Sequence, residues 1–106
     1  MKNYEPLTTM LNSNDKILKE LLSCSKEEFS SDEKKINISI GILSELREIL
    51  FSMDSELFIL NKELYNLITS LKKYSGNLFN NYKMVNSYKL YDCLKIDLAK
   101  LKSFFN

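Results

Sequence analysis

An apolar heptad repeat in the middle of the chain limits its folding more than any other feature. With Ile36 at position a, eleven of the twelve a and d positions up to residue 74 are apolar. In order these positions hold Ile36, Ser39, Leu43, Leu46, Leu50, Met53, Leu57, Leu60, Leu64, Leu67, Leu71 and Tyr74. A seam kept in phase over this length is typical of a long helix packed in coiled-coil fashion. The sequence therefore predicts one helix over about 31–75.

The composition agrees with an all-helical chain. Two glycines and one proline in 106 residues are too few for a multi-stranded sheet with many tight turns. Apolar residues at helical spacing predict two further helices, over about 6–24 and about 81–105. We therefore expect a single all-α domain over 1–106, an antiparallel bundle of three helices with a long coiled-coil-like central helix.

Start and stop signals define the expected ends of these helices. Pro6 suits the first turn of the first helix, and Gly76 can take the left-handed conformation that ends the central one. Ser30 with Glu33 forms a capping box at the start of the central helix. Ser25 with Glu28, three residues apart, is a second candidate for a helix start.

Two places leave the helix boundaries open. The polar run at 12–15 interrupts the first apolar pattern, so a shorter helix can begin near Asp15. Ser52 or Asp54 can cap a new helix, which would break the central helix near 52–55 and give a four-helix bundle. We favour a continuous helix because no glycine or proline marks the spot and the heptad phase passes through it unchanged.

The central helix has a wider apolar face than one seam requires. Phe51, Phe58 and Tyr65 share a heptad position about 100° around the helix from the a residues. Such a face needs at least two neighbouring helices, one of which can come from another chain. We expect the partner-binding residues to be Leu50, Phe51, Leu57, Phe58, Ile59, Leu60, Leu64 and Tyr65.

The residues for catalysis are missing from the chain. With no histidine, the sequence lacks the usual general base and the commonest metal ligand. Nucleophile-elbow, phosphate-loop and zinc-protease motifs are absent as well. We therefore expect no enzymatic activity, catalytic residue, metal, cofactor or small-molecule substrate.

The leading hypothesis is a helical protein–protein interaction module: a small subunit, adaptor or chaperone. It would bind a protein partner, or a second copy of itself as an oligomer, by helix packing, with charges such as Glu56 and Glu63 setting the register. The alternative is a compact four-helix inhibitor or immunity-type protein that blocks a target.

A nucleic-acid binder is the third and least favoured hypothesis. Residues 71–106 hold 7 basic and 2 acidic side chains, whereas residues 1–70 hold 8 and 12. Cations interleaved with aromatic rings suit nucleic-acid backbones and bases. However, on a helical wheel the lysines of this segment are dispersed, whereas a groove-binding helix gathers its charges on one face.

The sequence also bears on location and redox state. The amino terminus lacks the apolar core of a signal peptide, and no segment approaches the ~20 apolar residues of a membrane span. We therefore expect a soluble cytoplasmic protein. Cys24 and Cys93 are far apart in the chain and are expected to be reduced, buried or half-buried thiols.

Overall fold

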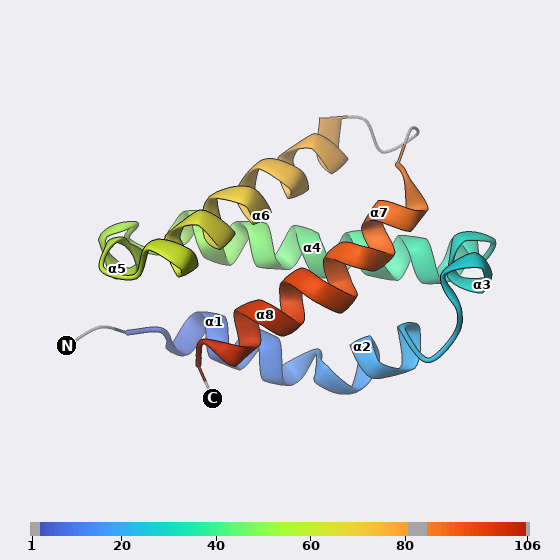
Figure 1. Ribbon diagram of the computed structural model, residues 1–106, viewed down its shortest axis with the longest axis horizontal. Helices are drawn as coiled ribbons and strands as arrows, with labels where there is room; N and C mark the ends of the chain where they lie inside the picture. The colour runs from blue at the N-terminus through green and yellow to red at the C-terminus, as the bar shows by residue number, and fades with distance from the viewer. Residues whose placement is uncertain (1–2, 81–84, 106) are drawn as a thin grey trace.

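Helices form all of the regular structure in residues 3–80 and 85–105, which are the residues that the computed structural model describes (Figure 1). They form a body 44 × 27 × 19 Å in extent. In chain order the elements are α1 (Glu5–Ser13), α2 (Asp15–Leu21), α3 (Lys26–Ser30), α4 (Glu33–Ser52), α5 (Glu56–Ile59), α6 (Lys62–Asn80), α7 (Ser87–Asp92), the π-helical segment η2 (Cys93–Asp97) and α8 (Leu98–Ser103). The all-α prediction is confirmed.

The prediction of one continuous helix over 31–75 is wrong. α4 ends at Ser52, and Met53 takes an extended conformation with φ −89° and ψ 148°. The Asp54 carboxylate accepts a hydrogen bond from the Glu56 amide at 3.0 Å, and the single turn of α5 follows. The Asn61 side chain then accepts one from the Leu64 amide at 3.2 Å, which caps the start of α6. The chain thus breaks near 52–55, as the four-helix alternative predicts.

Most of the heptad seam is buried within the chain because α4 and α6 fold back against each other (Figure 1). Leu43, Leu46 and Leu50 of α4 are almost fully buried, as are Leu64 and Leu71 of α6. An unbroken heptad phase predicts which residues face a partner helix. It does not require one helix, because two helices joined by a turn can bury their seams against each other.

The predicted helix over 6–24 is two helices, and the second begins at Asp15, as the alternative start predicts. α1 ends at Ser13, and the Asn14 side chain donates a hydrogen bond back to the Met10 carbonyl at 2.9 Å. Ser25 caps α3 by accepting from the Glu28 amide at 3.1 Å, so this helix start is confirmed. The capping box at Ser30 is wrong, because Asp32 caps α4 instead.

The ends of the last two helices also differ from the prediction. Gly76 does not end α6, which continues to Asn80. Instead it lies beside the Arg47 side chain, whose Nε would be 3.6 Å from an added Cβ. α7 begins at Ser87, where Asn86 accepts a hydrogen bond from the Lys89 amide at 3.2 Å. The predicted start of this helix, at 81, lies outside the described residues.

Tyr4 joins three distant parts of the chain at one end of the fold. Its ring centroid lies 5.9 Å from that of Phe58 in α5 and 5.1 Å from that of Phe105 near the C-terminus. Its hydroxyl donates to the Leu57 carbonyl at 2.6 Å. This cluster holds α5 and both chain ends together (Figure 1).

Candidate binding surfaces

The structure separates the eight predicted partner-binding residues into two groups. Leu50, Phe58 and Leu64 are buried at 0%, 1% and 5% exposure, and Leu57 is half-buried. These four belong to the core of this fold, so they are not available to a partner. The other four have exposed side chains: Phe51, Ile59, Leu60 and Tyr65.

The single turn of α5 explains why neighbouring residues differ so strongly. Successive helical residues point about 100° apart, so anchoring Phe58 in the core turns Ile59 sideways and Leu60 to the opposite side. Leu60 is 79% exposed and Ile59 is 57% exposed. Leu60 occupies a seam position in the heptad, but it lies between α5 and α6 and belongs to neither packed helix.

Phe51 and Tyr65 are exposed close to this turn. The Phe51 ring is in contact with two cations, with the Arg47 guanidinium at 4.7 Å and the Lys72 ammonium at 4.9 Å from its centroid. Tyr65 is seven residues before Lys72 in α6, so the two share a helix face. We call Phe51, Ile59, Leu60 and Tyr65 the apolar end, because α4 ends, α5 lies and α6 begins at this end of the molecule (Figure 1).

The charges around the apolar end are of both signs. Asp54, Glu56 and Glu63 are exposed in the segment 52–65, with Lys62 as its one cation. Arg47 and Lys72 add two further cations beside Phe51.

A hollow of about 380 Å³ lies between α6 and the α7–η2 segment. α6 contributes one face to it, with Ser70, Lys73, Tyr74 and Asn77 at helical spacing. The facing wall is formed by Lys89, Asp92, Cys93, Ile96 and Asp97. We call this hollow the α6–η2 groove. Part of its wall is a π-helix, a rare element that often occurs at functional sites.

The buried Cys93 thiol and the buried hydroxyl of the half-buried Tyr74, in the wall of the α6–η2 groove, stay protonated. Burial, followed by the nearby charge of Asp97, raises the pKa of the Cys93 thiol to about 12. Burial also raises the pKa of Tyr74, above its usual value of 10.0. Cys93 is therefore a neutral thiol rather than a thiolate nucleophile at ordinary pH. The buried Tyr74 hydroxyl makes no hydrogen bond to the described residues.

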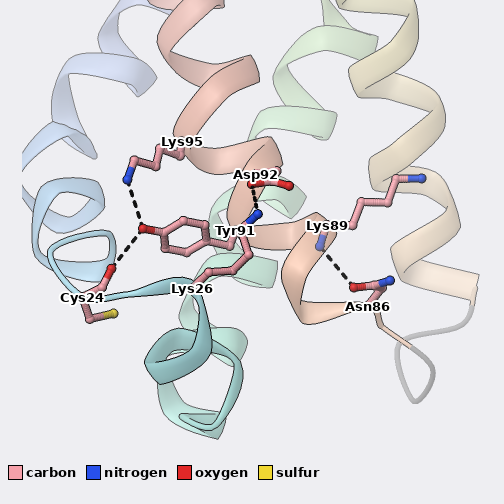
Figure 2. A network of polar contacts seen from close by, with 7 residues as sticks. All are labelled: Cys24, Lys26, Asn86, Lys89, Tyr91, Asp92 and Lys95. Carbon is pink, nitrogen blue, oxygen red and sulfur yellow. Dashed lines mark hydrogen bonds and ion pairs between the residues drawn. The ribbon is translucent and has the colours of Figure 1, made fainter.

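A polar network on the other side of α7 joins it to the segment before α3 (Figure 2). The Tyr91 hydroxyl donates to the Cys24 carbonyl at 3.0 Å and accepts from Lys95 at 3.2 Å. Asp92 pairs with Lys26 at 2.8 Å. This cluster packs α7 against the α3 segment, which is a structural role.

The basic C-terminal third does not form one charged face. Lys72 lies on Phe51, Lys89 on Tyr74 and Lys95 on Tyr91, three separate places in the fold. Lys102 pairs with Asp15 of α2. The dispersal that the sequence indicates is therefore present in the described residues, and Lys83 lies outside them.

The comparisons with known proteins add no family. No family model, curated protein or solved structure matches the chain. Within residues 3–80 and 85–105, no three His, Cys, Asp or Glu side chains are grouped closely enough to hold a metal ion. In the same residues, no helix combines the length and apolar character that crossing a membrane requires.

The sequence predicts all four residues of the apolar end as partner-binding, together with four that are buried or half-buried, and it does not predict the α6–η2 groove. The groove depends on how two helices are placed relative to each other, and its π-helix leaves no recognisable pattern in residues 93–97. In the sequence, the basic and aromatic residues of this region suggest nucleic-acid binding instead. The spacing 70, 73, 74 and 77 puts four polar side chains on one face of α6, which is the one sequence feature of the groove.

Proposed function

We propose that this chain is a non-enzymatic protein–protein interaction module that binds a protein partner through its apolar end. One observation carries the proposal. Eight large hydrophobic side chains of the described residues are exposed, and four of them fall between residues 51 and 65 at one end of the molecule. Exposed apolar residues that gather in one place, with a polar rim, are typical of interaction sites.

This proposal differs from the helix-face mechanism that the sequence suggests. A long central helix would offer its seam to a partner, but Leu50, Phe58 and Leu64 are buried inside this fold. The partner would instead contact the corner between α4 and α6, with Ile59 and Leu60 as anchors. Burying one such side chain stabilises a complex by about 2 kcal/mol.

The acids beside the two anchors favour a partner with basic side chains around an apolar patch. Glu56 and Glu63 are exposed near Ile59 and Leu60 and would steer and orient such a surface. Arg47 and Lys72 lie against Phe51, so the rim carries both signs. The mass of the complex therefore decides between a different protein and a second copy of this chain.

The test compares two variants that each replace one exposed apolar side chain by aspartate. Leu60→Asp places a charge on the apolar end, and Ile17→Asp places one on α2, where Ile17 is 42% exposed. Tagged wild-type and variant chains are used to purify bound proteins from the cells in which the protein occurs. We expect a protein retained by the wild type and by Ile17→Asp to be lost from Leu60→Asp.

Two controls make the result decisive. Circular dichroism should give the same helicity for all three chains, because both replaced side chains face solvent. Sedimentation should give the mass of one chain in each case. A partner that binds Leu60→Asp as strongly as wild type would contradict the proposed site. If the wild type is a dimer and Leu60→Asp abolishes it, the partner is a second copy of this chain rather than a different protein.

A further inference from the structure

A second hollow, of about 320 Å³, lies between the α1–α2 segment and the η2–α8 segment, and we call it the α2–α8 slot. One wall holds Leu11, Asp15, Leu18, Lys19 and Leu22, and the other holds Leu94, Lys95, Leu98, Ala99 and Lys102. The spacing of each set is helical, so each wall is one face of its segment. The volume lies within the range of about 300–1,000 Å³ that is typical of ligand pockets.

The apolar surface of the slot is entirely aliphatic. Five leucines and Ala99 supply it. Leu18 and Leu22 are half-buried and Ala99 is exposed, so part of this surface is open to solvent. Ala99 is the one alanine of the chain, and its small side chain leaves room in the η2–α8 wall. An aliphatic surface of this kind suits a hydrocarbon chain, which binds by apolar burial alone.

Two contacts bridge the walls and limit the length of the slot. Lys102 of α8 pairs with Asp15 of α2 near one end, and beyond the other end the Tyr91 hydroxyl donates to the Cys24 carbonyl at 3.0 Å (Figure 2). The helical segment from Asp15 to Leu22 spans roughly 10 Å. A helix is about 10–12 Å across with its side chains, so it could enter only by breaking these bridges. A single extended chain of about eight carbon atoms fits between them.

The charges of the slot favour an anion. Three lysines and one carboxylate line it, which gives an excess of two positive charges. Lys19 and Lys102 both pair with Asp15 and neutralise it. Lys95 lies at the end of the slot away from this cluster and donates to the Tyr91 hydroxyl at 3.2 Å. That bond uses one of the three donors of its ammonium group.

We propose that the α2–α8 slot binds a straight-chain aliphatic carboxylate of about eight carbon atoms. Its hydrocarbon chain packs on the leucines and Ala99, and its carboxylate accepts hydrogen bonds from the exposed Lys95 ammonium. The exposed Lys19 adds to the attraction. The slot therefore selects an alkyl carboxylate over an alkyl ammonium ion of the same length, and a longer chain over a short one.

Three simple probes test this selection on the full chain. Octanoate and octylamine share a chain of the same length and differ in the sign of their charge, and butanoate keeps the carboxylate with half the chain. Each is titrated into the isotope-labelled protein, and the amide chemical shifts are followed by NMR. We expect saturable shifts in residues 15–22 and 94–102 with octanoate and weaker binding of octylamine. Each buried methylene strengthens binding by up to about four-fold, so butanoate should bind far more weakly than octanoate.

Matched variants locate the binding groups. Lys95→Gln removes a cation of the slot and should weaken octanoate binding by about two-fold to five-fold, whereas Lys100→Gln makes the same change outside the slot and should leave it unaltered. Ala99→Trp fills the slot and should abolish saturable binding, whereas Ser103→Trp places the same ring elsewhere on α8. All four positions are exposed, so circular dichroism should give unchanged helicity.

Several results would overturn the proposal: no saturable shift with octanoate, shifts only in residues 51–65, octylamine binding as tightly as octanoate, or slot variants that bind like their controls. The slot shares no residue with the apolar end. Leu60→Asp should therefore bind octanoate as wild type does, and this test and the partner test can fail separately.

Discussion

Phe51 and Phe58 form a natural pair for testing the break in the central helix. They lie seven residues apart and occupy the same heptad position, so in one continuous helix they would face the same way. In the structure Phe51 is 56% exposed, whereas Phe58 is 1% exposed. Replacing each of them by alanine should therefore have very different effects on stability.

The expected magnitudes follow from the contacts of each ring. Phe58 is buried in the core and packs against Tyr4 at 5.9 Å between ring centroids, so Phe58→Ala should lower the free energy of unfolding by about 3–5 kcal/mol. Phe51 contacts Arg47 and Lys72 at the surface, where a cation–π contact contributes about 0.5–1 kcal/mol. Phe51→Ala should therefore cost about 1 kcal/mol, since the helical propensity of alanine offsets part of the loss.

The assay is urea unfolding followed by far-ultraviolet circular dichroism, with the free energy extrapolated linearly to water. Phe58→Leu is a control that keeps most of the apolar volume and should cost less than about 1.5 kcal/mol. If the two alanine variants lose the same free energy of unfolding, the two rings are not buried to different degrees. That result would contradict the turn between α4 and α6. If Phe58→Ala loses too much free energy to fold, Phe58→Leu is compared with Phe51→Leu instead.

Two further predictions concern titrating groups. Hydrogen bonds from Lys102 and then Lys19 lower the pKa of Asp15 below its usual 3.8, so the stabilisation by this carboxylate is present above that value and is lost as the pH falls through the lowered pKa. Asp15→Asn should therefore melt at a lower temperature than wild type at neutral pH, and the gap should close in strong acid; a gap that persists there would show another origin. The buried Cys93 thiol, with its pKa raised to about 12, should resist a thiol reagent in the native protein while the half-buried Cys24 reacts, and both should react in denaturant. Because the unfolded thiol ionises at lower pH than the folded one, stability should also fall as the pH rises above 9.0.

The sequence predicts helix content and core residues better than it predicts where helices end. Leu43, Leu46 and Leu71 follow the heptad and are buried, because a seam reports which side of a helix is covered. The break after Ser52 uses an extended Met53 and the side chains of Asp54 and Asn61, residue types that also occur inside helices. Propensity differences among them are well below 1 kcal/mol, so tertiary packing decides between the turn and the helix.

The two candidate surfaces also depend on tertiary packing, so the sequence predicts them to different degrees. Ile59 and Leu60 are exposed because the turn removes them from a packed helix, which the heptad alone does not reveal. Phe51 and Tyr65 are exposed on the outer faces of α4 and α6. The α6–η2 groove depends on the separation of two elements whose lining residues, over 70–77 and 89–97, are 12 or more residues apart in the chain. No local pattern encodes such a separation, although the polar face of α6 is visible in the spacing of its residues.

Leu60 shows how the break in the helix connects fold and function. It occupies a seam position, where a continuous helix would bury it, yet it is 79% exposed, the most of the eight exposed large hydrophobics among the described residues. The turn is compatible with stability because Phe58 and Tyr4 anchor α5 from the other side. Exposure of Leu60 therefore gives the isolated chain no packing energy, and burial by a partner would recover about 2 kcal/mol. A polar residue at position 60 should serve the monomer as well as leucine does, so the Leu60 side chain is available for the partner contact that we propose.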